Sequence, residues 1–341
     1  MKEVTSVSRI ISATLALGAT IALIGCTTGG GATTAPTQGA TTAPTTAPSD
    51  PPADTAVIGF SQANGGDEWR TNQNNNVRDY CKEYNPDAET IISDAQGDDA
   101  VQSGHVDEFI GRPVDVLLLT PNTDVGLNEA AKRAMAAGIP VITLDRKVID
   151  PVTQHIGADN KLIGRTAAEY VSKTILGGNG GKVIEIQGTQ GSSATTDRHD
   201  DFVKWLADND PSVEIVDSVD GDYKREVALN AMDDLLQKYG PGEVDVIYTH
   251  NDAMALGVVA ALETAGRLEE FKVVGIDGQN EAIQAIADGK IVVTFTYDNA
   301  GKEACESASK LLAGETIDPE WVLPTNTIDA SNVADWIGKG F

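Results

Sequence analysis

The sequence predicts an α/β protein made of two successive doubly wound parallel-sheet lobes. Short apolar runs alternate with longer amphipathic runs along most of the chain, which is the pattern of repeated β-α-β units with right-handed crossovers. This alternation restarts after about residue 157. A length of 341 residues is also sufficient for two domains. The natural place for a small ligand in such a protein is the cleft between the lobes.

The N-terminal segment has the features of an export signal. Lys2 and Arg9 precede a largely apolar run over residues 10–24, which is short for a membrane span. The sequence Leu-Ile-Gly-Cys, ending at Cys26, resembles the lipobox of bacterial lipoproteins. That resemblance implies a lipoprotein signal peptide at 1–25 and a diacylglycerol on the sulfur of Cys26. An ordinary secretory peptide with an incidental cysteine is the alternative.

Residues 26–53 consist almost entirely of Thr, Pro, Gly and Ala, and they offer nothing to bury. We expect a solvated, semi-extended tether there. The net charge of the chain is -26, which disfavours nucleic acid as a partner because phosphate binding needs a basic surface. The acidity is better explained by a solvated surface.

Cysteine and histidine usage gives no metal site and no cofactor. No Cys and His residues fall at metal-ligand spacing. Besides Cys26, the chain has Cys81 and Cys305, both in segments with helical patterns. The exported location permits a disulfide between them. Two separate buried thiols are the alternative, and sequence alone does not decide between the two.

The first lobe is expected to begin at residue 54. Its strands and helices follow from the period of the apolar residues. Strands are predicted at 55–60, 90–93, 114–120 and 139–144, and helices at 70–84, 98–110 and 125–137. Gly138 follows the last of these helices, where glycine commonly ends a helix.

The second lobe repeats the pattern after residues 155–157. Strands are predicted at 183–187, 213–218, 244–249, 272–276 and 291–295, and helices at 162–175, 192–209, 223–238, 253–265 and 281–288. A last long helix is predicted at 299–312. A further segment at 321–328 precedes the C-terminal tail.

Polar residues interrupt the apolar pattern at the ends of the predicted strands. The strand at 139–144 is apolar enough to be buried on both faces, and it ends at Asp145 and Arg146. Ligands of open α/β sheets bind beyond the carboxyl ends of the strands. These two side chains are therefore candidate ligand contacts, although a surface salt bridge is the alternative.

Further polar or aromatic residues occupy corresponding places after other strands. They are Trp69 and Arg70, Asp197 and Arg198, Asn251 and Asp252, and Asp277. An indole packs well on the apolar face of a sugar ring, while carboxylate, amide and guanidinium groups satisfy its hydroxyls. The set therefore indicates a sugar site more than a series of unrelated turns and helix caps.

Signals for an enzyme are weaker. The four His residues form no recognisable nucleophile–base pair. Residues 188–192 combine Gly and hydroxyl groups ahead of a helix, but they lack the spacing and the Lys of a P-loop. Asp145 and Asp277 could pose as the carboxylate pair of a glycosidase, but each is better explained by binding to hydroxyls. We therefore predict no enzymatic activity.

The stretches that carry these residues resemble the periplasmic sugar-binding family, in its ribose-binding cluster of ABC-importer receptors. The most distinctive are Leu-Asp-Arg at 144–146 and Asn-Asp-Ala-Met-Ala-Leu-Gly at 251–257. The resemblance covers residues 57–323 and implies the type I periplasmic binding protein fold, with three chain crossings that form a hinge. It places the crossings near 158–160, 297–299 and 323–325. The lobes would then be 54–158 plus 299–323 and 159–298 plus 324–341.

The resemblance also implies a set of ligand-binding residues. Those carried over from the family pattern are Trp69, Arg70, Asp145, Arg146, Arg198, Asn251 and Asp277. Within the family the chain is similar to the galactofuranose-binding branch, in Gly-Phe-Ser-Gln at 59–62 followed by Trp69 and Arg70, and in Gln-Gly-Thr at 187–189 with Asp197 and Arg198. Ribose binders carry a Phe pair in place of Trp69 and Arg70.

Two further candidates depart from the family pattern. Tyr297 stands where ribose binders have a Gln that contacts the sugar, which argues against plain ribose. Asp67 lies in the altered loop before Trp69. A furanose form of fructose, galactofuranose or arabinose suits an added indole and guanidinium.

The predicted function is that of a lipid-anchored, extracytoplasmic substrate-binding protein. It would act as a monomer on the outer face of the bacterial membrane and deliver a monosaccharide to an ABC permease. A sugar-sensing module of the same fold that signals to a membrane receptor is the alternative. An intracellular repressor core is disfavoured by the lipobox and by the absence of a basic helix-turn-helix before residue 54.

Overall fold

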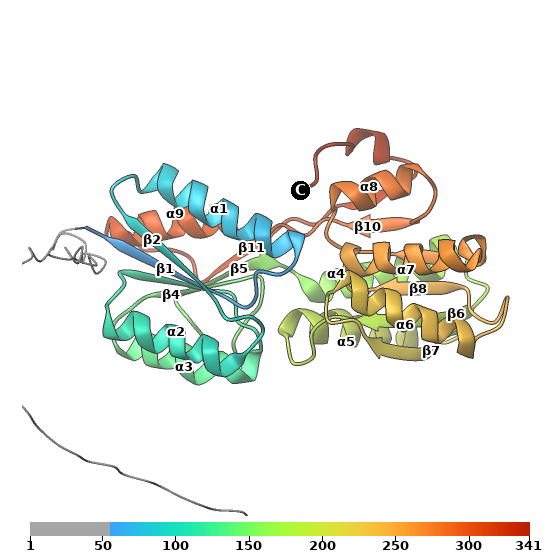
Figure 1. The fold of residues 1–341 in the computed structure, drawn as a ribbon, viewed down its shortest axis with the longest axis horizontal. Helices are drawn as coiled ribbons and strands as arrows, with labels where there is room; N and C mark the ends of the chain where they lie inside the picture. Colours follow the sequence, from blue (N-terminus) through green and yellow to red (C-terminus); the bar gives the residue numbers. More distant parts are fainter. Residues whose placement is uncertain (1–54) are drawn as a thin grey trace, which may run out of the picture. The chain divides into compact units, whose positions relative to one another are not determined.

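The computed structural model describes residues 55–341, which lie within one compact unit, 51–341. The expected signal peptide, Cys26 and the tether lie outside the described residues. Within 55–341 the strands form two six-stranded sheets, each flanked by helices on both faces (Figure 1). The predicted fold class, two doubly wound lobes, is thereby confirmed. No helix in this part of the chain is long and apolar enough to cross a membrane.

The first sheet has the strand order β11-β5-β4-β3-β1-β2, and all its pairs are parallel. Its strands are β1 (Val57–Gln62), β2 (Glu89–Asp94), β3 (Val116–Leu119), β4 (Val141–Leu144), β5 (Gln154–Ala158) and β11 (Glu320–Leu323). Strands β1, β3, β4 and β5 are buried along their whole length, as expected for parallel strands covered on both faces. The edge strand β2 is partly exposed.

Alternate residues of these strands pack into two separate cores. Ile58 and Phe60 of β1 lie in the core under α1 (Glu68–Tyr84) and α9 (Gly301–Leu312). Val57 lies in the opposite core, under α2 (Asp99–Gly111) and α3 (Asp124–Ala136). The two-residue period of a strand explains this division, and Figure 1 shows the two helix pairs on opposite faces of the sheet.

The second sheet has the order β12-β10-β9-β8-β6-β7. Its strands are β6 (Gly181–Gln187), β7 (Val213–Asp220), β8 (Val246–Thr249), β9 (Lys272–Val274), β10 (Val293–Phe295) and β12 (Thr327–Asp329). The edge strand β12 runs antiparallel to β10, whereas the other pairs are parallel.

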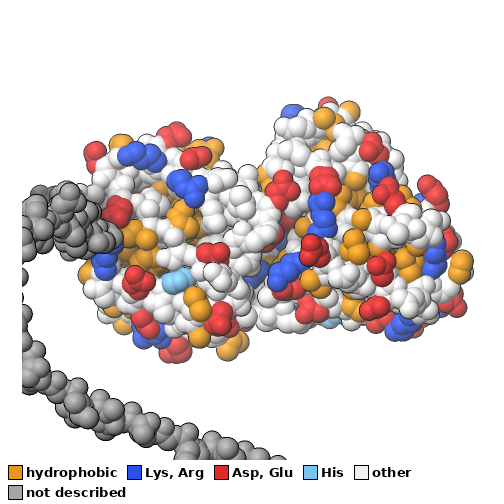
Figure 2. Space-filling view, in the orientation of Figure 1, with side chains coloured by type: hydrophobic (Ala, Val, Ile, Leu, Met, Phe, Trp, Pro, Cys, Tyr) orange, Lys and Arg blue, Asp and Glu red, His pale blue; other side chains and the backbone are white. Residues whose placement is uncertain are grey.

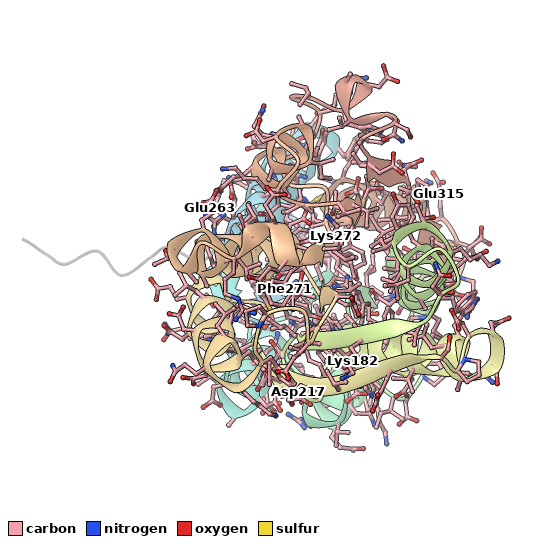
Figure 3. The ribbon with its side chains drawn as sticks, turned by 90° about the vertical axis from the view of Figure 1, so that its right-hand side faces the viewer. Lys182, Asp217, Glu263, Phe271, Lys272 and Glu315 are labelled. Carbon is pink, nitrogen blue, oxygen red and sulfur yellow. A yellow bond between two sulfur atoms is a disulfide. The ribbon has the colours of Figure 1, made fainter. Side chains whose placement is uncertain are left out.

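Helices again cover both faces of the second sheet. Those on one face are α4 (Asn160–Glu169) and α5 (Ser193–Asn209), and those on the other are α6 (Arg225–Lys238), α7 (Asp252–Ala265) and α8 (Asn280–Ala287). Helix α4 continues into a π-helical turn, Tyr170–Ile175. Phe271, just before β9, packs into the core under α6, α7 and α8. Lys182 and Lys272 are exposed near it (Figure 3).

The chain passes between the two sheets three times. The passages lie between β5 and α4, between β10 and α9, and between β11 and β12. The segment predicted as one unit at 321–328 is therefore two strands in different sheets, because β11 pairs with β5 and β12 pairs with β10. The carboxyl ends of the parallel strands of both sheets meet at the cavity described below.

A disulfide joins Cys81 of α1 to Cys305 of α9. The structure thus resolves the alternatives left open by the sequence in favour of a disulfide. Both cysteines are fully buried in the core under these two helices. The bond closes a loop with a sequence separation of 224 residues, so it removes many conformations from the unfolded chain.

Replacing both cysteines, Cys81→Ala and Cys305→Ala, should lower the free energy of unfolding by about 2–5 kcal/mol. Urea unfolding of residues 51–341 would measure this change. In the presence of a thiol reductant, the free energy of unfolding of the wild-type protein should fall toward that of the variant. The free energy of unfolding of the variant should not change with reductant. Equal stability of the two oxidised proteins would show that the bond contributes nothing.

Candidate functional site

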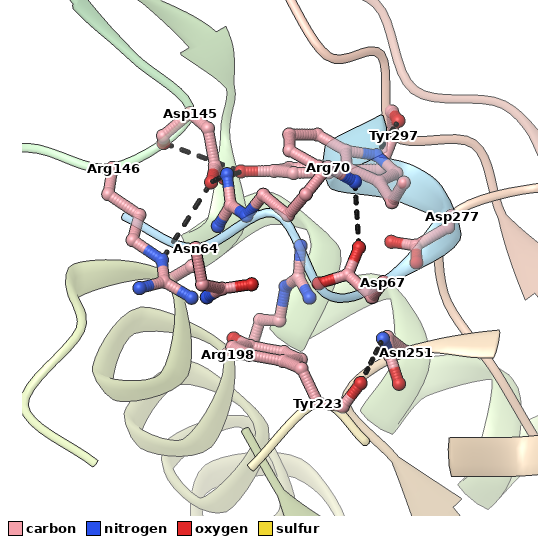
Figure 4. Close-up of a pocket in the computed structure, with 12 residues that line it drawn as sticks. Asn64, Asp67, Arg70, Asp145, Arg146, Arg198, Tyr223, Asn251, Asp277 and Tyr297 are labelled. Atoms are coloured by element: carbon pink, nitrogen blue, oxygen red, sulfur yellow. Dashed lines mark hydrogen bonds and ion pairs between the residues drawn. The ribbon is translucent and has the colours of Figure 1, made fainter. Parts of the chain in front are cut away.

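A cavity lined mainly by polar and aromatic side chains lies between the two lobes (Figure 4). Its walls come from loops and helix starts at the carboxyl ends of strands in both sheets. The residues that line it are Asn64, Asp67, Trp69, Arg70, Asp145, Arg146, Ala194, Arg198, Tyr223, Asn251, Asp277 and Tyr297. All nine candidates from the sequence are brought together there. Their roles in binding a ligand stay predictions.

Asp145 occupies the centre of the first-lobe wall. It follows β4 directly, and its φ of 65° lies in the left-handed region, which Asp tolerates better than most residues. One carboxylate oxygen, Oδ2, lies 2.6 Å from Nη1 of Arg70, and the other, Oδ1, accepts a 2.6 Å hydrogen bond from the hydroxyl of Tyr297. Burial by itself raises the pKa of Asp145, but Arg70 and Arg146 outweigh it and hold that pKa below its usual value.

Arg146 is buried but incompletely paired. Its Nη1 donates to the carbonyl oxygen of Asn122 at 2.8 Å. Its Nε lies 3.7 Å from Oδ2 of Asp145, too far for a hydrogen bond, and has no other partner among the described residues. Burial and the neighbouring Arg70 guanidinium lower the pKa of Arg146. A buried N–H group without a partner is a free-energy cost that a ligand acceptor can relieve.

Aromatic rings form a second part of the wall. Trp69, at the start of α1, stacks on Tyr297 with ring centroids 5.7 Å apart, and its Nε1 donates to the Tyr297 carbonyl oxygen at 3.0 Å. The Arg70 guanidinium lies 4.6 Å from the indole centroid. The indole is thus fixed by a hydrogen bond and by contacts on its faces.

Arg198 of α5 supplies the second-lobe cation. Its Nε donates to Oδ1 of Asn160 at 2.8 Å, and its Nη1 donates to the carbonyl oxygen of His250. The guanidinium carbon lies 4.4 Å from the ring centroid of Tyr297. Burial would lower the pKa of Arg198, but the surrounding tyrosines and Asp277 raise it above its usual value. Arg198 therefore stays charged at the cavity wall.

Two of the candidates also cap helices. Oδ1 of Asp67 accepts from the backbone N–H of Arg70 at 2.7 Å and begins α1. Oδ1 of Asn251 accepts from the N–H of Met254 at 2.9 Å and begins α7. Capping explains why Asp and Asn occur at these positions, and it leaves part of each side chain facing the cavity. Burial raises the pKa of Asp67.

Asp277 is the least satisfied carboxylate of the site. It is 6% exposed, its φ is 131°, and no hydrogen bond to its carboxylate oxygens is found among residues 55–341. Burial raises its pKa well above the usual value, and the nearby Asp252 carboxylate adds to the shift. Such strain and missing partners are characteristic of functional sites.

Three residues that line the cavity were not among the candidates from the sequence: Asn64, Ala194 and Tyr223. The sequence pattern predicts Tyr223 at the start of a helix, but α6 begins at Arg225. Asp222 and Tyr223 both have positive φ, and the Tyr223 ring covers Gly188 so closely that a Cβ there would lie 2.0 Å from it. The sequence offers no local signal for this contact, because Gly188 is flanked by Gln187 and Thr189 and lies far from Tyr223 along the chain.

Asp197 and Asp252, which the sequence paired with Arg198 and Asn251, do not line the cavity. Asp197 lies 3.8 Å from Lys161 at the surface. Asp252 is buried behind the wall, where its carboxylate accepts from Thr294 and from the N–H groups of Gly278 and Gln279. Its role is to fix the loop that carries Asp277.

The cavity opens toward solvent past Asn64, Asp67 and Tyr223, which also line a wider groove. Charged residues of both signs border this groove, among them Glu68, Lys224 and Arg225. Figure 2 shows the molecule hollowed between the lobes, with acidic and basic side chains beside the hollow. The groove provides a route for a ligand from solvent to the cavity.

The fold and the site together define a two-lobed ligand receptor with an interlobe polar cavity. Comparison with protein families matches residues 58–316 to the periplasmic binding protein domain. The chain belongs to the periplasmic binding protein family.

Curated relatives include three import or sugar-binding proteins. The ribose import binding protein of Escherichia coli (strain K12) is 35% identical over 68% of this chain and 77% of its own. The fructose import binding protein of Bifidobacterium longum (strain NCC 2705) is 30% identical over 67% and 71%. The galactofuranose-binding protein of E. coli (strain K12) is 28% identical over 80% and 87%. The predicted resemblance to sugar-binding receptors is thereby confirmed.

Solved structures agree on the fold. A Mycobacterium smegmatis protein in complex with β-D-fucofuranose has a TM-score of 0.77 and 28% identity, covering 82% of this chain and 93% of its own. The fructose-binding periplasmic domain of a hybrid two-component system also has a TM-score of 0.77 and 28% identity, over 83% and 94%. The match over nearly the whole of those chains confirms the type I periplasmic binding protein fold.

The unpartnered carboxylate leads to a pH-dependent prediction. In the unfolded chain the pKa of Asp277 is near its ordinary value of 3.8, and in the folded protein this pKa lies well above that value. Above about pH 4 the folded state therefore loses stability that a neutral side chain would keep. Asp277→Asn should raise the free energy of unfolding at pH 7.5 more than at pH 4.5, by up to about 1.4 kcal/mol per pH unit between the two pKa values.

Urea unfolding of the ligand-free protein at the two pH values measures this difference. The matched control is Asp234→Asn, on the exposed side of α6. A stability difference that stays constant with pH would show that Asp277 is not destabilised by its charge.

Proposed function

We propose that this protein is the lipid-anchored substrate-binding protein of an ABC sugar importer, and that it captures a monosaccharide in its furanose form, with fructose, galactofuranose and arabinose as the leading candidates. The observation that carries the proposal is the cavity itself. It combines a fixed indole with guanidinium donors and carboxylate acceptors from both lobes. An apolar ring face and several hydroxyls are the features that such walls recognise.

The relatives support the sugar class. Their names describe import or binding of ribose, fructose and galactofuranose, and one solved neighbour holds a fucofuranose. Each is described as a binding protein and not as an enzyme. Trp69, Arg70 and Tyr297 form one connected group, so a ligand meets an indole and a guanidinium on the side where ribose binders carry a Phe pair. This difference favours a furanose other than ribose.

The unpartnered groups define where the ligand hydroxyls would bind. Arg146 offers an Nε–H without an acceptor. Asp277 lines the cavity, and no hydrogen bond to its carboxylate is found among residues 55–341. One comes from each lobe, so a ligand that satisfies both would bridge them. A sugar that bridges the lobes stabilises the closed arrangement relative to the open one.

Direct contacts already join the lobes at one end of the cleft. The N–H of Asp124 donates to the carbonyl oxygen of Gly191 at 3.2 Å, and the N–H of Lys147 donates to Oγ of Ser193 at 2.8 Å. These bonds support closure by a hinge motion at the three chain passages.

A sensory module is the second candidate function. The fructose-binding domain of a two-component system has the same fold and a similar degree of identity. A transport receptor should be required for uptake of its sugar, whereas a sensor should be required only for the response to it. Loss of uptake on deletion of this protein therefore distinguishes the two functions.

Thermal unfolding against a panel of monosaccharides tests the ligand class. Fructose, galactose, arabinose, ribose, xylose and glucose would each be added in large excess to residues 51–341. A sugar at a hundred times its Kd stabilises the folded state by about 2.7 kcal/mol and raises the Tm. We expect a shift with one or two of the sugars that populate furanose forms.

The shift should disappear in Trp69→Ala, because the stacking surface is lost. It should persist in Trp205→Ala, a matched variant on α5 outside the cavity wall. A chain that responds to none of the six sugars would contradict the proposed ligand class.

Lipid anchoring rests on Cys26 and has its own test. Cys26→Ser in the full-length chain should abolish incorporation of labelled fatty acid and move the protein from the membrane fraction to the soluble fraction. Thr27→Ser, which leaves the sulfur in place, is the matched control. Unchanged membrane association of the Cys26 variant would contradict the anchor.

A further inference from the structure

A chain of hydrogen bonds crosses the hinge from one lobe to the other. Nε of Arg198 donates to Oδ1 of Asn160 at 2.8 Å, Nδ2 of Asn160 donates to the hydroxyl of Tyr297 at 3.0 Å, and that hydroxyl donates to Oδ1 of Asp145 at 2.6 Å. All four side chains are buried, with exposures of 2% to 6%. The first and last members are candidate ligand contacts on opposite walls of the cavity.

The direction of every bond in this chain is fixed. A guanidinium only donates, so the oxygen of the Asn160 amide must face Arg198 and its nitrogen must face Tyr297. The Tyr297 oxygen therefore accepts from Asn160, and its proton goes to Asp145, an ionised carboxylate that only accepts. The low pKa of Asp145 and the raised pKa of Tyr297 agree with this arrangement of protons. No alternative orientation keeps the three bonds.

The two central residues lie in the hinge. Asn160 is the first residue of α4, directly after the passage from β5, and Tyr297 lies in the passage from β10 to α9. Asp145 ends β4 in the first sheet, and Arg198 belongs to α5 beside the second. A rotation that separates the lobes must lengthen or break at least one bond of the series.

The hydroxyl of Tyr297 already donates and accepts within the protein. Its ring is held between the Trp69 indole, at 5.7 Å, and the Arg198 guanidinium, at 4.4 Å. The donor that a ligand would need from this residue is committed to Asp145. Tyr297 thus lines the cavity without a free proton to offer.

We propose that Tyr297 and Asn160 are positioning residues that orient Asp145 and Arg198 for the ligand and restrain the angle between the lobes through this hydrogen-bonded series. The proposal rests on the proposed function for its effect on sugar binding, but its effect on the lobes does not. Tyr297, which stands where ribose binders have a Gln, then acts in the hinge and does not recognise the sugar directly.

The affinity for sugar of variants that lack the Tyr297 hydroxyl or the Asn160 amide tests this hydrogen-bonded series. Tyr297→Phe keeps the ring and removes the hydroxyl, and Asn160→Ala interrupts the series without touching the ring. Each should weaken binding of the sugar from the six-member panel that raises the Tm most, by about tenfold or more, measured by calorimetry. The double variant should bind about as weakly as the weaker single variant, because both changes break the same series.

Deoxy sugars distinguish positioning from direct contact. If Tyr297 only positions, Tyr297→Phe weakens the parent sugar and each monodeoxy analogue by the same factor. If the weakening vanishes for one analogue, the hydroxyl binds that position directly and the proposal is overturned. Tyr170→Phe, which removes a hydroxyl bonded to Asp329 outside the cavity, should leave all affinities unchanged.

A second measurement needs no ligand. Spin labels at Glu108→Cys on α2 and Gln237→Cys on α6, both exposed, report the distance between the lobes in residues 51–341. Tyr297→Phe and Asn160→Ala should each broaden or lengthen the distance distribution, whereas Tyr170→Phe should not. Unchanged distributions in both hinge variants would overturn the proposal. A broadened distribution in a protein that binds no sugar would support the series and contradict the proposed function instead.

Discussion

The cavity depends on the compensation of one buried negative charge, that of Asp145. A carboxylate removed from water is costly by several kcal/mol unless it is paired and hydrogen-bonded. Here a guanidinium from α1 takes one oxygen, and a phenol from the hinge takes the other. These partners come from sequence positions 70 and 297, so the charge is compensated only when the first lobe and the second chain passage are both in place. The full set of partners of Asp145 therefore exists only where the hinge is formed.

The groups around Asp145 divide into satisfied and unsatisfied ones. Asp67 and Asn251 complete helices, and Arg198 has protein acceptors for two of its nitrogens. Arg146, in contrast, keeps an Nε–H without a partner, and no hydrogen bond to the Asp277 carboxylate is found among residues 55–341. Real proteins depart from full polar satisfaction mainly where they bind something. The satisfied groups give the cavity a fixed shape, and in the proposed function the unsatisfied ones are the groups that ligand hydroxyls would meet.

The sequence was most informative where one physical rule acted alone. Alternating apolar periods predicted the two doubly wound lobes. Polar and aromatic residues after the predicted strands gave seven of the nine candidates that share one cavity, and the family resemblance added Asp67 and Tyr297. The rule failed at Tyr223, because the residues just before Arg225 still have a helix-like composition. In the structure the backbone at 222–223 instead forms a left-handed turn, with the Tyr223 ring packed over Gly188. It also failed at 321–328, since no local pattern tells a chain to leave one sheet and enter another. Both failures depend on contacts with residues distant in the sequence.

The disulfide has a topological consequence for the second lobe. Its two cysteines flank every strand of the second sheet except β12, together with the first two passages of the hinge. The second lobe is therefore almost entirely an insertion within a covalent ring whose closure lies in the first lobe. A single protease cut anywhere in that insertion would leave the pieces covalently joined. The first lobe, with Trp69 and Arg70 on the helix that carries Cys81, would keep both of its discontinuous chain segments attached to each other.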